Sequence, residues 1–414
     1  MSTQTLSGNM LRIEELKSYL TTEGYAAEVQ QRCVGIARHF FAYLECKALT
    51  IESVSFADEE GFVKWELKNF RKRHEREPRD FRQWCWIRRG AVHIVMRLLR
   101  GKWPVAPDPT TSLEVYHRDL LQGYEAWMRD LRGLSARTRS TRKTQALQFL
   151  TSLADRGSQQ DMRALTIHDT DGYLRKQCAG WSRRSIHSCA SGLRVFLRYL
   201  NSAGHTLSDL SDTVLGPRLY EHEHIPSALR PEDIERVLEA TRRDTSLCGR
   251  RDYALMMLLA TYGLRRCELL ALRLEDINWR SEVLRVRHAK NREYSDLPLL
   301  KAPGEAVLRY LQARAKTAHR EIFLRIPAPH RPLKSLNTML SDRLKAAGVV
   351  PLGKKGAHAF RHARAASMLR ATVSIKTIGD VLGHKSAHST AVYLKLATED
   401  LRSVCLELPK GVLP

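Results

Sequence analysis

Four residues near the C-terminus have types and spacings that suit chemistry on a phosphodiester. His358 and Arg361 lie three residues apart at the start of an expected helix, so both side chains can face one ligand. His384 follows a Leu-Gly pair at which a second helix is expected to stop, and Tyr393 comes a short step later. Arginine and histidine can stabilise a pentacoordinate phosphate, and a tyrosine can serve as the nucleophile. A single residue of any of these types is most often structural, so the order of the whole set is what favours this chemistry.

The residues around this set predict the helices that must position it. Apolar residues from 375 to 382 have the spacing of a packed helix, and Gly383 is a natural left-handed stop after it. His384 is therefore expected to leave the helix end and to reach sideways. Ser389 could cap a short last helix that carries Tyr393 on its second turn.

A mixed domain over residues 225–414 is expected to carry the set. An apolar helix should end near Gly263, since glycine readily adopts the left-handed conformation of a helix stop. Two short strands, at 283–287 and 295–299, should form a hairpin with Lys290 in or beside its turn. The sequence therefore predicts a mainly α-helical domain with one small antiparallel sheet.

Two helical regions precede that domain, at residues 1–103 and 112–205. Both show apolar stripes of helical spacing, and the proline-rich stretch Pro104–Ser112 is the clearest linker in the chain. A second linker is expected over Gly204–Ser227. We interpret the second region as a helical DNA-binding domain and the first as an extra helical module that could also bind DNA.

The two helical regions resemble each other weakly. FADEEGFV at 56–63 matches IHDTDGYL at 167–174, and AVHIVMRLL at 91–99 matches GLRVFLRYL at 192–200. The offsets of the two matches differ by ten residues, so the repeat is imperfect. These matches predict two related helical modules.

Cations gather at two expected helix starts in the second region. Hydroxyl residues accompany them, and a helix start of this kind can hold phosphates through backbone N–H groups and arginine together. Such groups would position DNA rather than read its bases. The candidate DNA-binding residues are Arg137, Arg139, Arg142, Lys143, Arg183 and Arg184.

The chain is strongly basic. Its 414 residues include 68 Lys and Arg against 45 Asp and Glu, a net charge of +23 (68 − 45). This excess favours nucleic acid as a partner, because released phosphate counterions drive such binding. An anionic membrane is the rival, but the sequence has neither a basic amphipathic tail nor a long apolar run, so we expect no membrane partner. In the first region, segment 64–90 combines arginines with Trp84 and Trp86 and could lie along a DNA backbone; a solvated helix face is the alternative.

The cysteines and histidines predict neither disulfides nor a metal site. The eight cysteines are scattered without a CxxC pair, so we expect them to be reduced and mostly structural, with Cys267 packed. His222 and His224 lack further ligands at zinc spacing, and we expect no metal and no other cofactor. The N-terminus lacks the apolar core of a signal peptide, so we expect a cytoplasmic protein.

The joint order of the motifs resembles the tyrosine recombinases, which include phage integrases and bacterial recombinases that resolve chromosome dimers. The motifs in chain order are TYGLRRCELLALRLEDI from 261, HAKNREYSDLPL from 288, HAFRHA from 358, LGH from 382, and Tyr393. The resemblance covers 225–408 strongly and extends over 112–205 as that family's core-binding domain, whereas 1–103 lies outside the usual pattern. It implies helical DNA-binding modules followed by an α+β catalytic domain.

The resemblance also implies which residues hold the scissile phosphate. Arg265, within a GLRxxE pattern, and Arg361 would clamp the non-bridging oxygens, because a guanidinium fork fits two oxygens and stays charged. His384 would donate a hydrogen bond to the same phosphate. Glu268, one turn beyond Arg265, would hold the site in shape.

The remaining roles concern the nucleophile and the leaving group. The resemblance implies that Tyr393 attacks phosphorus, giving a 3′-phosphotyrosine and a free 5′ hydroxyl, while His358 shuttles its proton or orients the phosphate. Lys290 stands eight residues before Pro298, where the family's hairpin lysine stands, and would protonate the leaving oxygen. The family usually flanks this lysine with glycines, which are absent here. The phosphotyrosine keeps the bond energy, so neither ATP nor a metal is needed, consistent with a sequence that has no P-loop.

The implied partners are double-stranded DNA and further copies of the chain, as a dimer to tetramer on DNA. The apolar tail after Tyr393 is expected to dock on a neighbouring protomer, with packing on its own domain as the alternative. The resemblance is also compatible with companion recombinases of the same mobile element as partners, and with association with the bacterial nucleoid. A type IB topoisomerase uses the same catalytic groups, and an inactive DNA-binding accessory protein is the alternative from another class; the complete set of catalytic residues argues against the latter.

Overall fold

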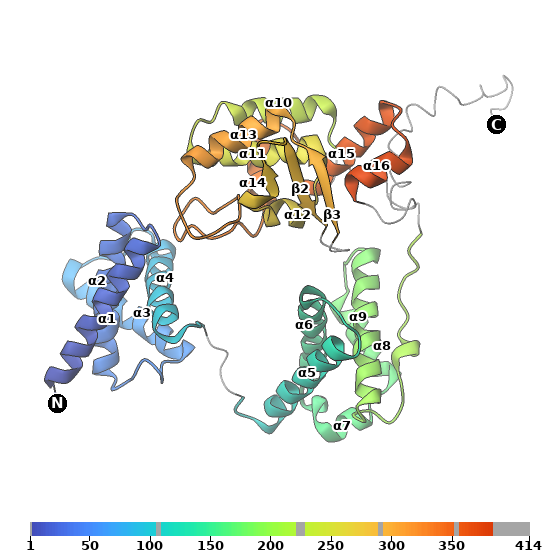
Figure 1. The fold of residues 1–414 in the computed structure, drawn as a ribbon. Coiled ribbons are helices and arrows are strands. Elements are labelled where there is room, and N and C mark those ends of the chain that lie inside the picture. The colour runs from blue at the N-terminus through green and yellow to red at the C-terminus, as the bar shows by residue number, and fades with distance from the viewer. Residues whose placement is uncertain (1, 105–108, 221–227, 289–292, 352–355, 384–414) are drawn as a thin grey trace, which may run out of the picture. The chain divides into compact units, whose positions relative to one another are not determined.

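The computed structural model describes residues 2–104, 109–220, 228–288, 293–351 and 356–383 (Figure 1). The chain divides into two compact units, Pro104–His224 on the one hand and Met1–Trp103 with Ile225–Pro414 on the other. The described residues are mainly α-helical with one small antiparallel sheet, as predicted. The three predicted domain boundaries stay predictions. None of the described helices combines the length and the apolar character needed to cross a membrane.

The first helical module, described over residues 2–103, has a core made from the inner faces of its helices. These are α1 (Ser2–Thr22), α2 (Ala27–Cys46), α3 (Phe56–His74) and α4 (Phe81–Arg100). Helix α2 packs against α1, α3 and α4. Asp58 accepts a hydrogen bond from the Ser55 backbone N–H at 2.8 Å and so fixes the start of α3. Trp84 is buried in this core, which contradicts both alternatives for it, along DNA and on a solvated helix face, whereas Trp86 is 74% exposed.

The second helical module forms the unit Pro104–His224. Its helices are α5 (Ser112–Asp130), α6 (Ala136–Leu153), α7 (Gln159–Arg163), α8 (Ile167–Gln177) and α9 (Arg183–Ser202). Helix α6 packs against α5, α8 and α9. The predicted linker after α9 is partly wrong, because Ser211 and Val214 are buried and the Val214 carbonyl accepts a hydrogen bond from Arg194 at 2.9 Å. This segment belongs to the core of the module.

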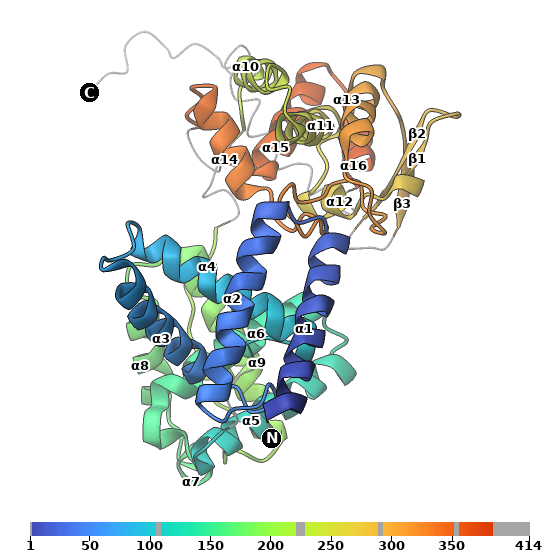
Figure 2. The ribbon, with the colours of Figure 1, turned by 90° about the vertical axis from the view of Figure 1, so that its left-hand side faces the viewer.

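Helix α11 lies at the centre of residues 228–383. The helices of this part of the chain, in order, are α10 (Pro231–Arg242), α11 (Leu247–Tyr262), α12 (Arg266–Ala271), α13 (Lys301–Ala313), α14 (Asn337–Ala346), α15 (Ala357–Arg370) and α16 (Ile375–Leu382). Helix α11 packs against α10, α13 and α15, and Figure 2 shows it between α10 and α13. Its apolar residues are buried on almost every side, which explains why they run nearly unbroken in the sequence.

The small sheet has the strand order β1-β2-β3, all antiparallel. Its strands are β1 (Ile277–Asn278), β2 (Val283–Arg287) and β3 (Tyr294–Pro298). The predicted hairpin is confirmed: β2 has the expected bounds, and β3 begins and ends one residue earlier than expected. The short strand β1 was not predicted, since two residues carry no alternating pattern.

Candidate active site

Two glycine turns bring the predicted arginines together. Gly263 ends α11 with φ of 62°, and Gly383 ends α16 with φ of 63°, so both helix stops adopt the expected left-handed conformation. A side chain at Gly263 would come within 2.9 Å of Leu382 Cδ2, which shows how closely the two turns approach. Arg265 and Arg361 both reach this place from different helices.

Arg265 stands at the start of α12 and is held by Glu268. The Glu268 carboxylate accepts one hydrogen bond from the Arg265 backbone N–H at 2.8 Å and another from its Nη1 at 2.6 Å. Burial alone would raise the pKa of Glu268, but hydrogen bonds from the Arg265 backbone, His288 and the Arg265 side chain lower it below its ordinary value. Glu268 is therefore ionised at neutral pH and fixes the direction of the guanidinium.

Arg361 is almost completely buried, at 3% exposure, on α15. Its Nη1 donates to the Gly263 carbonyl at 2.9 Å and its Nη2 to the Leu382 carbonyl at 2.5 Å. Arg265 donates from its own Nη2 to the next carbonyl, that of Gly383, at 3.0 Å. Both guanidinium groups thus converge on the end of α16, immediately before position 384.

His358 lies one turn before Arg361 on α15 but in different surroundings. It is exposed, and its ring centroid lies 6.2 Å from that of His362. Lys290, His384 and Tyr393 lie outside the described residues. Of the expected catalytic set, the structure therefore brings together Arg265, Glu268 and Arg361 around the two glycine turns and leaves His358 at the surface of the same helix.

The candidate DNA-binding residues lie where α6 and α9 begin. Ser135 and Ser182 cap these helices, each accepting from a backbone N–H at 3.3 Å. The two helices run in the same direction where they touch, since Arg142 donates to Ser191 at 3.2 Å and Phe149 meets Phe196 further along. Their first turns, with the cations, therefore share one end of the module.

The cations at this end differ in their partners. Arg137 and Arg184 are exposed, and Arg183 donates to the Arg218 carbonyl at 2.8 Å. Arg139 donates to the Leu134 carbonyl at 2.6 Å, and Lys143 forms an ion pair with Glu125 at 2.6 Å. Part of the cationic charge is thus already compensated within the module.

One residue of the site was not predicted, and one residue beside the site is exposed where a buried residue was expected. His288, the first residue of the HAKNREYSDLPL motif, was assigned no role, yet it is buried at 4% exposure and contacts Glu268. No periodicity could have revealed it, because its partners come from other elements. Cys267 is exposed, so the expectation that it is packed is wrong. Within the described ranges, no cluster of three or more His, Cys, Asp or Glu side chains could hold a metal ion.

Comparisons with known proteins agree with this architecture. The sequence model of the phage integrase family matches residues 227–400. The integrase/recombinase y4gC of Sinorhizobium fredii is 53% identical over 186 residues, which are 45% of this chain and 97% of that protein. The integrase/recombinase y4rA of the same organism is 35% identical over 330 residues, covering 77% of this chain and 78% of the relative.

Lambda integrase shows the same fold at 18% identity. Its dimer bound to a COC′ core site has a TM-score of 0.52, with 76% of this chain and 87% of that chain covered. Its tetramer bound to a Holliday junction has a TM-score of 0.51, with 73% and 85% covered. Together with the two relatives, which this chain covers over most of their length, these findings show that the chain belongs to the phage integrase family of tyrosine recombinases, enzymes that recombine DNA at specific sites.

Proposed function

We propose that this recombinase cuts and rejoins double-stranded DNA through a 3′-phosphotyrosine on Tyr393, without a metal ion or ATP, in the integration, excision or transposition of a mobile element. The observation that carries the proposal is the convergence of Arg265 and Arg361 on the carbonyls of Leu382 and Gly383. Two fixed guanidinium groups at one place suit a phosphate whose negative charge increases in the transition state.

The proposed reaction needs only side chains of the chain and its DNA. The Tyr393 oxygen attacks phosphorus, its proton passes to His358, and the 5′ oxygen leaves with a proton from Lys290. Arg265 and Arg361 bind the non-bridging oxygens, assisted by His384. A free tyrosine has a pKa near 10, so nearby cations and a proton acceptor are needed for attack at neutral pH. A second 5′ hydroxyl can then reverse the step, because the phosphotyrosine keeps the bond energy.

The proposed grip on DNA comes from the second helical module, with copies of the chain assembling on the DNA as dimers to tetramers. Lambda integrase, which has this fold, was solved as a dimer and as a tetramer on DNA. The exposed cations at the starts of α6 and α9 suit the phosphates of a duplex. Companion recombinases of the same element could join this assembly.

The test uses a nicked suicide duplex that carries the DNA flanking the gene, incubated with wild type and with Tyr393→Phe and separated on a denaturing gel. We expect a shifted covalent band with wild type only, formed equally well in EDTA, while both proteins bind the duplex. A band that survives Tyr393→Phe would place the nucleophile elsewhere. A strict requirement for a divalent metal would contradict the metal-free mechanism. Relaxation of any supercoiled plasmid by the monomer would favour a topoisomerase.

A further inference from the structure

His288 contacts three parts of the candidate active site: Glu268 on α12, strand β3, and the glycine turn that ends α16. It follows strand β2, and its backbone N–H donates to the Glu293 carbonyl at 2.8 Å across the hairpin. Its ring is buried, and a side chain added at Gly383 would collide with it. The imidazole therefore packs directly against the turn that ends α16.

The two ring nitrogens of His288 have different partners. Nδ1 lies 3.0 Å from Glu268 Oε1, and Nε2 lies 2.8 Å from the hydroxyl of Ser295 on β3. Because Glu268 is an ionised carboxylate that can only accept, Nδ1 must carry a proton. The Glu268 oxygen that accepts from His288 also accepts from Arg265 Nη1. One carboxylate oxygen is thus shared by the arginine and the histidine.

We infer that His288 is a positioning residue, which fixes the Glu268 carboxylate that orients Arg265 and so ties this arginine to the β2–β3 hairpin. The inference rests on the proposed catalytic role of Arg265. A carboxylate held by the arginine alone could rotate with it, whereas a second donor on a rigid strand fixes one orientation. In sequence, Lys290 stands only two residues after His288, so the same tie joins the arginine to the segment that carries the proposed general acid.

The consequence is a specific effect on cleavage rather than on DNA binding. Misplacing a phosphate-binding group by about 1 Å can cost on the order of 100-fold in rate. We expect His288→Ala to slow formation of the covalent DNA adduct by roughly 10- to 100-fold, with DNA affinity unchanged within about threefold. Arg285→Ala is the matched control, because it removes an exposed ion pair with Asp296 from the same two strands.

Two conservative variants separate positioning from filling of the buried space. The amide of Asn reaches the place of Nδ1, whereas the amide of Gln reaches the place of Nε2. His288→Asn keeps a donor for Glu268 and should recover most of the cleavage rate. His288→Gln keeps only a partner for Ser295 and should remain slow. Equal rates in the Asn and Gln variants would contradict positioning through Glu268.

Hydrogen exchange gives a second measurement that does not depend on catalysis. In the full chain without DNA, His288→Ala and His288→Gln should speed amide exchange at the start of α12, and His288→Asn should not. Unchanged exchange around α12 in His288→Ala would overturn the inference, whether or not wild type cleaves DNA. If exchange changes as expected but wild type forms no covalent adduct, the proposed function is contradicted. The positioning of Glu268 by His288 is then still supported.

Discussion

In the first helical module, Phe62 of α3 meets Phe40 of α2 edge-on at 5.2 Å, and in the second module Tyr173 of α8 meets Phe149 of α6 in the same way at 5.1 Å. The same helix start precedes both rings, since Asp169 accepts from the Thr166 backbone as Asp58 accepts from Ser55. The weak sequence repeat therefore corresponds to a shared helical frame. What differs between the modules is the chemistry placed on it.

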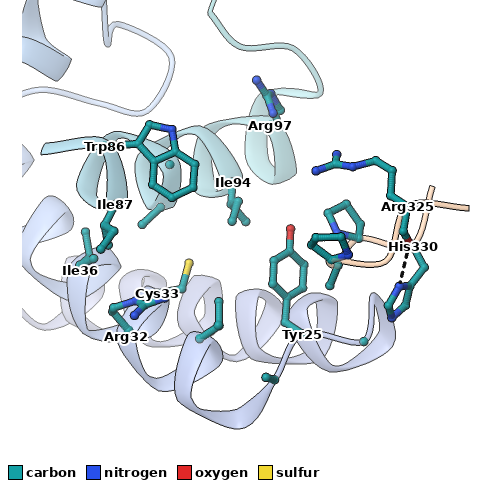
Figure 3. A pocket seen from close by; sticks show the side chains of 18 of the residues that line it. Tyr25, Arg32, Cys33, Ile36, Trp86, Ile87, Ile94, Arg97, Arg325 and His330 are labelled. Atoms are coloured by element: carbon teal, nitrogen blue, oxygen red, sulfur yellow. Dashed lines mark hydrogen bonds between the residues drawn. The ribbon is translucent and has the colours of Figure 1, made fainter. Parts of the chain in front are cut away.

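The chemical difference between the modules is clearest where two helices pack together: α2 and α4 in the first module, and α6 and α9 in the second. Positions in α2 and α6 correspond at an offset of 109 residues, which matches Phe40 to Phe149 (149 − 40 = 109). Positions in α4 and α9 correspond at an offset of 101 residues, which matches the start of AVHIVMRLL to that of GLRVFLRYL (192 − 91 = 101). In the second module the paired positions hold Arg142, Gln145, Ser188 and Ser191, which are joined by hydrogen bonds across α6 and α9. In the first module they hold Cys33, Ile36, Ile87 and Gly90, which line an apolar pocket (Figure 3).

The helix starts differ in the same sense. By the same pairing, exposed Arg137 and Arg184 of the second module correspond to Glu28 and Gln83 of the first. At these two positions the shared frame therefore carries exposed arginines in the second module and uncharged or acidic side chains in the first. The difference shows that a helical architecture alone does not determine which side chains its helix starts present.

The largest expected difference lies in a buried carboxylate. Glu59 of the first module is 1% exposed and accepts from His93 and from Trp103 Nε1, both at 3.0 Å, whereas its counterpart is Thr170, bonded to its own helix. Glu59→Ala leaves these donors unpaired and should lower the local free energy of unfolding by about 3 kcal/mol. Thr170→Val should cost about 1 kcal/mol or less.

Hydrogen exchange of the α3–α4 and α8–α9 amides in the full chain measures both variants, because it resolves the modules separately. Similar losses in both modules would show that their polar cores are energetically equivalent and would weaken the contrast.

DNA affinity should depend on the second module far more than on the first. Arg137→Ala combined with Arg184→Ala should weaken binding about tenfold. The slope of log K against log salt concentration should become shallower by about 2, because each lost phosphate contact changes this slope by nearly 1. Arg32→Ala with Arg82→Ala removes the same charge from the exposed starts of α2 and α4 and is the matched control. Salt titrations of duplex binding measure both. An equal loss in the control would mean that the first module also grips the backbone.

A pair of glycines should respond with opposite signs. A Cβ at Gly61 of α3 would collide with the hydroxyl of buried Tyr43, whereas at the corresponding Gly172 of α8 nothing lies within 4 Å. Gly61→Ala should cost about 1 kcal/mol or more through overpacking. Gly172→Ala should stabilise α8 by about 0.5–1 kcal/mol, since it lowers the entropy of the unfolded chain. Thermal unfolding of the two variants checks the signs, and the same sign in both would contradict the packing difference.

The smallest effect is expected at the surface of the apolar pocket. Trp86 is 74% exposed, so Trp86→Ser should change the free energy of unfolding by no more than about 0.5 kcal/mol and should leave duplex affinity unaltered. Fluorescence-detected unfolding and a binding titration measure the two quantities. A clear loss of affinity would place this face of the first module on DNA.

Local features of the fold could be predicted because neighbouring residues determine them. The stops at Gly263 and Gly383, the starts of α6 and α9 and the β2–β3 hairpin all occur where they were predicted. Each depends on a backbone conformation or on a hydrogen bond to a residue a few positions away.

Features decided by packing could not be predicted in this way. Trp84 is buried although it was expected to be exposed, and Cys267 is exposed although it was expected to be buried. Val214 is buried within an expected linker. His288 finds Glu268 and Ser295 only after the hairpin has packed against α12. Burial depends on which elements meet, and a single sequence carries no direct signal of that.

Arg361 holds two turns together as well as carrying charge, and this has an evolutionary consequence. Its contacts with the Gly263 and Leu382 carbonyls are buried, so replacing it would cost stability even in a copy that no longer recombines DNA. Purifying selection for folding alone would then preserve this arginine. When a relative loses activity, substitutions are expected to accumulate first at reactive positions that the fold does not need. An intact Arg361 in a relative is therefore evidence of an intact fold rather than of an active enzyme.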